Sequence, residues 1–539
     1  MTLENKALLT LNGENSFISL SDPDVFEGRP CIDHKALFTV LPKKAIDTES
    51  LLNADMQQFH KTIDETTTQI GSATFYRSLC SPLTNPDDII KKQHAVQELE
   101  SNNLLRQRVQ EYLGEFVKVE RDLFRFLMQD GDRPRDTYTI FKKAQQAAAV
   151  FSDLTASNGD GITSDYLKTL LRRVMTVDNS RPYRMLVHNP YLTFNGVVPL
   201  NELKWYIPRR ELKPSPWTLD AIALPLFSTL GTGGILDLMS TGIGQYIAIG
   251  TVSVGTAMGL AGYLSWRKNA FYEKVMQPIK TGLLNDAAFN YAMEATGTLD
   301  ELLSFITFRK RYPNMTCMPK IVDGPEQYIK TKNLKSPVMI MQSDHPGFDI
   351  DLSEQNNMVV TGRHSTGKSK LGRRLFYAAV QAQTGSHVMA DAFEIVPADK
   401  LFFHMSMMES AGVQGGGVEQ EFAYLKSMWD QSTPKTFIIM HDVGGTLPDS
   451  EVIAQEKRLM GGYYRMGGTT ILITSYGPLA KDLADSGLAA CIHAELRGKA
   501  PTGRFVPGIH HESNIEYLQQ TSVLFTDEEI SSRLAQFGR

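Results

Sequence analysis

The sequence predicts a helical amino-terminal half followed by a carboxy-terminal α/β domain with a mainly parallel sheet and flanking helices. Charged segments between Asp55 and Phe151 carry apolar residues at steps of three and four, as amphipathic helices do. From about Val338 onward, short apolar runs alternate with helical stretches. The strand-like runs are NMVVTG, SHVMADAF, KLFFHMSM, TFIIMHDV and TTILITSY. Strands separated by helices favour a sheet with its ligand at the carboxyl ends of the strands.

One of these strands enters a loop with the pattern Gly-x-x-x-x-Gly-Lys-Ser, within the run VVTGRHSTGKSKLGRRLF. Its glycines let backbone N–H groups face a phosphate, and the next helix adds the positive end of its dipole. Lys368 would reach the β- and γ-phosphates of ATP, and the Ser369 hydroxyl would be a Mg²⁺ ligand. The predicted nucleotide-binding residues are Gly362, His364, Ser365, Thr366, Gly367, Lys368 and Ser369. A surface turn could match by chance, but the flanking strand Asn357–Thr361 and helix Lys368–Gln383 favour a P-loop ATPase domain.

The composition limits the other possibilities. A chain of 539 residues is long enough for about three or four domains. The net charge of −5 provides no global basic field for non-specific nucleic-acid binding. Four cysteines are scattered without a Cys-x-x-Cys pair, which argues against a zinc site or disulfide framework and suits a reducing compartment. The amino terminus has no apolar core long enough for a secretory signal.

The segment Ala221–Trp266 has Asp237 as its single charged residue. Within it, Ile247–Trp266 is uncharged and would span about 30 Å as a helix, which matches a bilayer core. Basic residues on both sides favour a hairpin with both ends at the cytoplasmic face. We therefore expect membrane association on the cytoplasmic side, with membrane lipid as a partner. The alternative is a buried hairpin in a soluble cytoplasmic protein, because Pro225 interrupts the first run and Asp237 is costly in lipid.

Changes in composition and periodicity divide the chain into six segments. They are an amino-terminal segment (1–35), the first part of a helical core (36–220), the apolar hairpin (221–267), the second part of the core (268–335), the P-loop ATPase domain (336–510) and a carboxy-terminal tail (511–539). No internal repeat or low-complexity tract is visible in the sequence.

Several segments together resemble a known family. The run TGRHSTGKSKLGRRLFYAAVQAQTGSHVMADAFEI places a phosphate loop, a helix and a Gly-Ser step before an acidic strand end. Upstream lie DMQQFHKTIDETTTQIGSATFYRSLCSPLTNPDDIIKKQHAVQEL, GTLDELLSFITFRKRYPNMTCMPKI and YIKTKNLKSPVM. In this order they are similar to the MutS-type ATPases, the mismatch-repair superfamily, over most of Phe38 to Leu496. The resemblance implies a MutS-like helical core, ATP and Mg²⁺ as cofactors, a homodimer, and DNA as a partner.

The sequence differs from the family in the regions with which family members bind DNA. Mismatch-reading members carry an amino-terminal domain with a Phe-x-Glu wedge, and we expect no such domain in this sequence. The tripeptide at Phe271–Glu273 matches by chance, because it follows the apolar hairpin. The family's DNA clamp interrupts the helical core near the place where the hairpin lies here. The chain therefore looks closest to a subgroup that lacks the mismatch-reading domain and carries apolar, transmembrane helices in the core.

The strand TFIIMHDVGGT carries the residues expected for hydrolysis. Family members end this strand with Asp-Glu, of which the first orders Mg²⁺ and the second polarises the attacking water. Here His441 stands at the first position and Asp442 at the second. A slip of one residue would instead make Asp442 the Mg²⁺ partner and leave Val443 at the position of the base. In either register the resemblance implies that Asp442 is the catalytic residue and, with Ser369, a metal ligand, while His441 is a packed or solvent-facing residue.

Other family positions also differ. His364 replaces an Asn of the phosphate loop, the loop VQGGGVEQEF lacks the family's hydroxyl, and Ser475 follows Thr474 where a His is usual. General-base and charge-stabilising groups contribute about 10²–10⁴-fold each to rate, so ATP binding should be kept better than hydrolysis. These differences imply a Mg²⁺-dependent ATPase with a degenerate hydrolysis site.

Three functions fit this sequence. The leading one is a dimeric, membrane-attached MutS-like ATP-binding protein whose nucleotide state changes the conformation of the helical core, with weak or slow hydrolysis. The second is a soluble DNA-binding ATPase in mismatch repair or recombination. The third is a catalytically silent scaffold that retains the fold for binding a partner.

Overall fold

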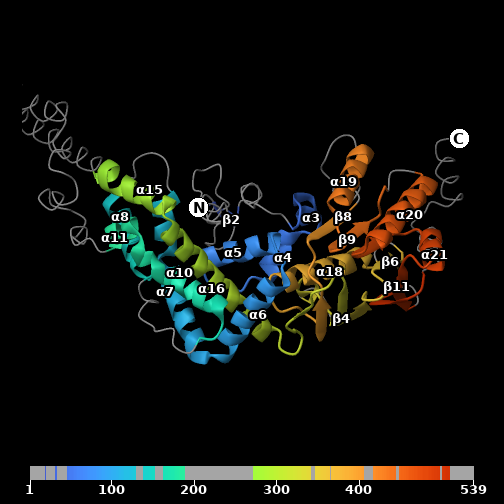
Figure 1. Ribbon diagram of the computed structural model, residues 1–539, viewed down its shortest axis with the longest axis horizontal. Coiled ribbons are helices and arrows are strands. Elements are labelled where there is room, and N and C mark those ends of the chain that lie inside the picture. The colour runs from blue at the N-terminus through green and yellow to red at the C-terminus, as the bar shows by residue number, and fades with distance from the viewer. Residues whose placement is uncertain are drawn as a thin grey trace, which may run out of the picture.

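The computed structural model describes residues 18–19, 31–32, 45–128, 137–151, 162–187, 271–340, 346–363, 366–405, 417–444, 448–497 and 500–509. Within these ranges the molecule is elongated, with helices at one end and sheets at the other (Figure 1). The predicted order, a helical half followed by an α/β part, is confirmed. A short antiparallel pair, β1 (Ile18–Ser19) and β2 (Cys31–Ile32), comes before both halves in the chain.

The helical half contains segments from both sides of the predicted apolar hairpin. The first group is α3 (Thr48–Asn53), α4 (Met56–Ile63), α5 (Gln69–Cys80), α6 (Pro86–Ser101), α7 (Asn103–Met128), α8 (Thr137–Ala149), α10 (Asp165–Met175), the 3₁₀ helix η1 (Thr176–Asn179) and α11 (Arg181–Val187). The second group is the π-helical turn η4 (Tyr272–Met276), α15 (Gln277–Asn285) and α16 (Ala287–Arg311). Most of these helices bury one apolar face against their neighbours in a shared core.

Helix α16 runs through the centre of this half (Figure 1). Asp286 caps its start by accepting a hydrogen bond from the Phe289 N–H at 2.9 Å, and its last turn is basic, as the helix dipole favours. Gly297 allows α5 to pack closely, because a Cβ atom there would lie 2.3 Å from Thr74 Oγ1. The contact of α5 with α16 therefore joins the chain before the predicted hairpin to the chain after it.

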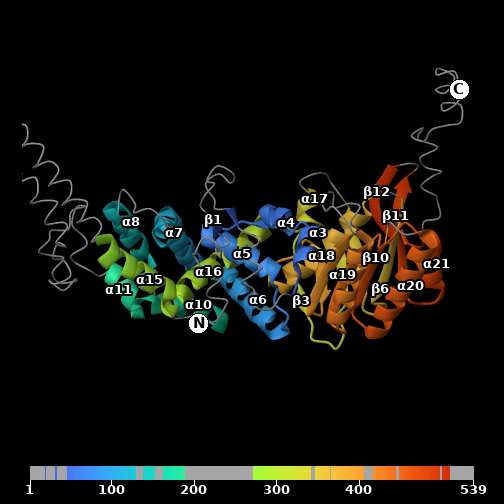
Figure 2. The ribbon, with the colours of Figure 1, turned by 90° about the horizontal axis from the view of Figure 1, so that it is seen from above.

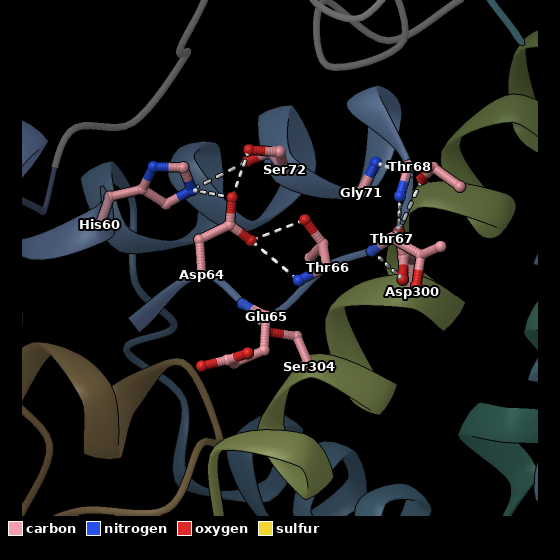
Figure 3. Close-up of polar contacts among 10 residues, drawn as sticks. All are labelled: His60, Asp64, Glu65, Thr66, Thr67, Thr68, Gly71, Ser72, Asp300 and Ser304. Atoms are coloured by element: carbon pink, nitrogen blue, oxygen red, sulfur yellow. Dashed lines mark hydrogen bonds and ion pairs between the residues drawn. The ribbon is translucent and has the colours of Figure 1, made fainter. Parts of the chain in front are cut away.

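A buried carboxylate of α16, Asp300, holds the turn between α4 and α5 against that helix, and Asp64 bonds within the turn (Figure 3). Asp300 of α16 accepts hydrogen bonds from the Thr67 N–H at 3.0 Å, the Thr68 N–H at 2.7 Å and the Thr68 hydroxyl at 2.6 Å. Asp64, just after α4, accepts from the N–H and the hydroxyl of Thr66. Because a buried carboxylate is costly without donors, these bonds specify how the turn meets α16.

The larger sheet has six strands in the order β12-β11-β6-β10-β9-β8. Their bounds are β6 (Asn357–Thr361), β8 (Lys400–Met405), β9 (Thr436–His441), β10 (Thr469–Ile473), β11 (Ala490–Arg497) and β12 (Ala500–Pro507). All neighbours are parallel except β11 and β12. The flanking helices are α18 (Lys368–Gln383), α19 (Gly417–Gln431), α20 (Asp449–Met466) and α21 (Gly477–Asp485). β6, β9 and β10 are buried throughout, as expected for parallel strands covered by helices.

A second, mixed sheet was not predicted. It has four strands in the order β3-β7-β4-β5, with the short helix α17 between β4 and β5. The bounds are β3 (Lys320–Ile321), β4 (Ile329–Leu334), α17 (Pro337–Ile340), β5 (Phe348–Asp351) and β7 (Ala392–Ile395). The predicted strand SHVMADAF is therefore misplaced: the strand begins near its end, at Ala392, and pairs in this second sheet.

Helix α18 connects the two halves and lies beside α4 (Figure 2). The Tyr377 ring stacks on Phe59 of α4 with ring centroids 4.0 Å apart, and the Tyr377 hydroxyl donates to the Ala54 carbonyl. At the end of α18, the Gln383 side chain donates to the Leu83 carbonyl at 2.8 Å, and the Leu83 N–H donates to the Gln383 carbonyl at 3.1 Å. The helix that begins at the glycine loop therefore ends against the helical half.

The helices of the described ranges differ from membrane spans. None of the helices in these ranges combines the length and the apolar character needed to cross a bilayer. The longest of them, α7, carries charged side chains along one face. The predicted apolar hairpin, 221–267, lies outside the described residues.

Candidate functional site

The Gly-x-x-x-x-Gly-Lys-Ser loop lies between β6 and α18, and β6 is an inner strand flanked by β10 and β11. Gly362 follows the strand with a φ of 148°, and a Cβ atom on it would lie 3.1 Å from Thr366 Oγ1. Gly367 precedes α18 with a φ of 95°, in the left-handed region that glycine adopts readily. The loop thus needs both glycines for its backbone path. His364 and Ser365, also predicted to bind nucleotide, lie outside the described residues.

Lys368 is the first residue of α18, and its side chain is buried inside the loop. Its ammonium donates to the Gly362 carbonyl at 2.6 Å and to the Arg363 carbonyl at 3.1 Å. The Thr366 hydroxyl donates to the same Arg363 carbonyl at 2.8 Å. The loop backbone therefore curls around a positive charge at a helix N-terminus, an arrangement suited to an anionic ligand.

The end of β9 faces the start of α18 through His441. Oγ of Ser369 lies 2.8 Å from Nε2 of His441, and Nδ1 of His441 lies 3.4 Å from Oδ2 of Asp442. Of the two registers open from sequence, the structure has His441 at the position that faces Ser369 and Asp442 one residue further on. His441 is packed, as one of the two expected alternatives had it, and its imidazole also contacts the hydroxyl predicted to bind metal.

Asp442 lies at the turn where β9 ends. Its φ of 47° is left-handed, and its N–H donates to the Ile473 carbonyl of β10 at 2.9 Å. Its side chain is partly exposed, but Oδ1 is buried and has no hydrogen-bond partner among the described residues. Left-handed backbone is tolerated by Asp and Asn better than by most residues. The structure thus brings a carboxylate with one unsatisfied oxygen to the same edge of the sheet as the loop.

Two buried glutamates near this edge were not predicted from sequence. Glu456 of α20 accepts from the Val443 N–H and lies 3.3 Å, through Oε2, from the Thr474 hydroxyl at the end of β10. Glu421 of α19 accepts from the Gly444 N–H at 3.0 Å, and its Oε1 lies 2.9 Å from Nε2 of His404. Together they hold the turn after β9 in place.

Burial raises the pKa of Glu456 to about 8, and the nearby charge of Asp442 adds to this effect. A pattern in the sequence could have identified this residue. Val452, Met460 and Tyr463 form the buried stripe of α20, and Glu456 occupies a position on that stripe at helical spacing. A carboxylate in an apolar stripe indicates a buried polar site.

Glu456→Gln should stabilise the protein at alkaline pH. The folded-state pKa of about 8 lies above the ordinary value of 4.5, so the stabilisation from this group is complete below 4.5 and is lost as pH rises through about 8. Because glutamine stays neutral, the difference in thermal unfolding midpoint between the variant and wild type should grow from about pH 4.5 and level off above about pH 8. Glu451→Gln, on an exposed position of the same helix, should show no such growth. A difference independent of pH would mean that Glu456 is ionised in the folded protein.

The residues at this edge fit the phosphates of a nucleotide better than they fit Mg²⁺. Lys368, the loop N–H groups and the start of α18 supply positive charge for phosphate oxygens. Ser369 and Asp442 offer oxygen atoms, which Mg²⁺ prefers, but the group bonded to Ser369 is an imidazole nitrogen and not a carboxylate. The donor set therefore departs from that of a Mg²⁺ site.

Comparison with known proteins gives a family match and distant relatives. The family model for MutS domain III matches residues 45–305, the helical half and its interruption. The DNA mismatch repair protein MutS of Chloroflexus aurantiacus is 24% identical over 479 residues, which cover 77% of this chain and 48% of that protein. MutS of Anaplasma phagocytophilum is 24% identical over 424 residues, covering 71% of this chain and 49% of that protein.

A eukaryotic relative shows a shorter match. The DNA mismatch repair protein MSH3 of Cryptococcus neoformans is 24% identical over 170 residues, covering 31% of this chain and 14% of that protein. The chain spans about half the length of the bacterial relatives it matches. Its similarity to them therefore extends over both halves of the described structure but not over the whole of either relative.

The membrane localisation expected from the sequence is corrected by these findings. The relatives are named as DNA mismatch repair proteins, and no helix of the described ranges could cross a bilayer. The expectation came from the length and low charge of Ile247–Trp266, and those two properties are shared by membrane helices and by apolar segments that pack against protein.

Proposed function

We propose that this chain, whose domain III match and mismatch-repair relatives support membership of the MutS family, is a DNA-binding ATPase of mismatch repair or recombination. The observation that carries the proposal is the domain III match over 45–305, followed in the same chain by the Gly-x-x-x-x-Gly-Lys-Ser loop between β6 and α18. We infer that ATP binds at this loop, that the chain acts as a homodimer, and that the bound nucleotide changes the conformation of the helical half.

The loop geometry supports the ATP part of this proposal. Six of the predicted site residues lie within the described ranges, and all six come from one edge of the sheet. They are Gly362, Thr366, Gly367, Lys368, Ser369 and Asp442. When ATP enters, the Lys368 ammonium exchanges the Gly362 and Arg363 carbonyls for phosphate oxygens, which are stronger acceptors because they are charged. Binding therefore releases two loop carbonyls and reorders the loop.

The contacts of α18 support the proposal that bound nucleotide changes the conformation of the helical half. A change at the loop moves the first residue of α18, Lys368, and a helix transmits displacement along its axis because its backbone bonds are internal. The far half of the helix is attached to the helical half through Tyr377 and Gln383, which bond to Ala54 and Leu83. Nucleotide entry therefore has a short physical route to α4 and to the segment before α6.

Asp442→Asn is expected to lower ATP turnover by at least about tenfold while nucleotide affinity changes little. Asparagine keeps the size and tolerates the left-handed φ of 47°, so the variant removes the carboxylate charge without straining the turn. Turnover is measured by phosphate release at saturating ATP, and affinity by titration with a fluorescent ATP analogue. Asp482→Asn, an exposed carboxylate on α21, is the matched control. Equal turnover in both variants would make Asp442 a structural residue of the turn.

The DNA part of the proposal is tested by retention on duplex DNA. Because contacts with phosphates release counterions, affinity should fall by at least about tenfold as salt rises from about 50 to about 200 mM. ATP should change retention of the wild-type protein, whereas Lys368→Ala should bind DNA without a response to ATP. Absence of retention at low salt would leave the partner-binding scaffold as the better function. Light scattering with and without ATP measures the oligomeric state in the same samples.

A further inference from the structure

We propose that His441 makes nucleotide binding at this loop nearly independent of Mg²⁺, which sets this site apart from phosphate loops that bind the metal complex of the nucleotide. The inference rests on the proposed ATP site, and it concerns one residue, the imidazole bonded to Ser369. It identifies His441 as a specificity-determining residue for the form of nucleotide that the loop accepts.

The contact with Ser369 is built into the fold. β9 and β10 pair in parallel with His441 opposite Ile473, which fixes the backbone at the end of β9. The His441 side chain is 5% exposed, and its Nε2 lies 2.8 Å from Oγ of Ser369 on the first turn of α18. The imidazole therefore faces the hydroxyl that a Mg²⁺ ion at this loop would need as a ligand.

The imidazole supplies the hydrogen bond but no negative charge. Its Nε2 lies 2.8 Å from Oγ of Ser369, and its Nδ1 lies 3.4 Å from Oδ2 of Asp442. Whichever ring nitrogen carries the proton, the imidazole brings no negative charge to Ser369. A carboxylate at this position would accept the same bond and would also attract a divalent cation. Neither protonation form of imidazole does so, and Mg²⁺ binds nitrogen less well than oxygen.

The remaining carboxylates near the turn are directed to other partners. Glu421 bonds to the Gly444 N–H and to His404, and Glu456 bonds to Thr474 and the Val443 N–H. Within the described residues, no group of three or more His, Cys, Asp or Glu side chains is arranged to hold a metal ion. Asp442, the neighbour of His441 in the chain, has its Oδ2 3.4 Å from Nδ1 of the imidazole.

Phosphate binding does not need the metal at this loop. The Lys368 ammonium and the N–H groups at the start of a helix of 16 residues supply positive charge directly to the phosphates. A free nucleotide carries more negative charge than its Mg²⁺ complex, and the site has no carboxylate at position 441 to repel it. Both effects favour binding of the metal-free form.

The test compares nucleotide affinity in excess Mg²⁺ with affinity in EDTA, using a fluorescent ATP analogue on the full chain. For wild type, removal of Mg²⁺ should weaken affinity by less than about fivefold. For His441→Asp the same ratio should exceed about fiftyfold, because the added charge repels the free nucleotide and attracts the cation. His441→Asn, which is neutral and can accept the Ser369 bond, should keep the wild-type ratio.

Each outcome is decisive. A ratio above about fivefold for wild type would overturn the inference even if neither variant folds, since this measurement needs no variant. Equal ratios for His441→Asp and His441→Asn, both folded by circular dichroism, would overturn the charge argument. If wild type binds no nucleotide in either buffer, the proposed ATP site itself is wrong. That result differs from strong Mg²⁺ dependence, which overturns the inference and keeps the site.

Discussion

Lys368→Ala should weaken ATP binding by at least about 100-fold, a loss of about 2.7 kcal/mol. The ammonium is the positive group that the loop backbone encloses, through the Gly362 and Arg363 carbonyls, at the N-terminus of α18. Charge-assisted bonds to phosphate are among the stronger interactions a side chain can make, so its removal should be the largest single-residue effect on affinity. Fluorescent nucleotide titration measures it directly, and loss of the stabilisation of wild type by ATP in thermal unfolding provides a second measurement.

Lys370→Ala is the matched control for this prediction. Lys370 lies two residues further along α18 and is exposed, so its charge is screened by water and should contribute little to affinity. The unfolding midpoint without nucleotide shows whether Lys368→Ala is folded. Similar affinities for the two variants would mean that nucleotide binds elsewhere or that the loop is a structural turn.

Asp300→Ala should lower the free energy of unfolding by about 3 kcal/mol. Removing the carboxylate leaves the buried N–H and hydroxyl of Thr68, and the partly buried N–H of Thr67, without their acceptor. Gly71 packs so closely that a Cβ atom on it would lie 2.1 Å from Asp300 Oδ2, so the fit around this carboxylate is tight (Figure 3). The turn between α4 and α5 would then lose its attachment to α16.

Urea unfolding followed by far-UV circular dichroism measures this loss. Glu115→Ala is the control: it removes a carboxylate from α7 that is 58% exposed and paired with Lys118, and exposed pairs contribute less than about 1 kcal/mol. If Asp300→Ala costs no more than the control, the N–H groups of the turn are satisfied by water in its absence. The Asp300 carboxylate would then position the turn between α4 and α5 without stabilising the fold.

Local signals explain which parts of the structure were predictable. The strand Asn357–Thr361 and the helix Lys368–Gln383 have the bounds of β6 and α18 as predicted. Their signals are contained within a few residues: an apolar run, two glycines where φ is positive, and apolar spacing along the helix. The second sheet was missed for the opposite reason. β7 pairs with β3 and β4, which lie about 60 to 75 residues earlier in the chain, and no local pattern specifies such partners.

The candidate site also has features that local sequence specifies and features that only tertiary packing specifies. The sequence by itself determined the Gly-x-x-x-x-Gly-Lys-Ser loop between a strand and a helix and the presence of Asp442 at a strand end, because each is encoded by residue type and short spacing. Tertiary structure alone decided that His441 and not Asp442 faces Ser369, since that depends on the register of β9 beside β10, and adjacent residues of a strand point to opposite sides. It also brought Glu456 to Asp442 from a separate helix, because burial and charge proximity arise from packing between elements distant in the chain.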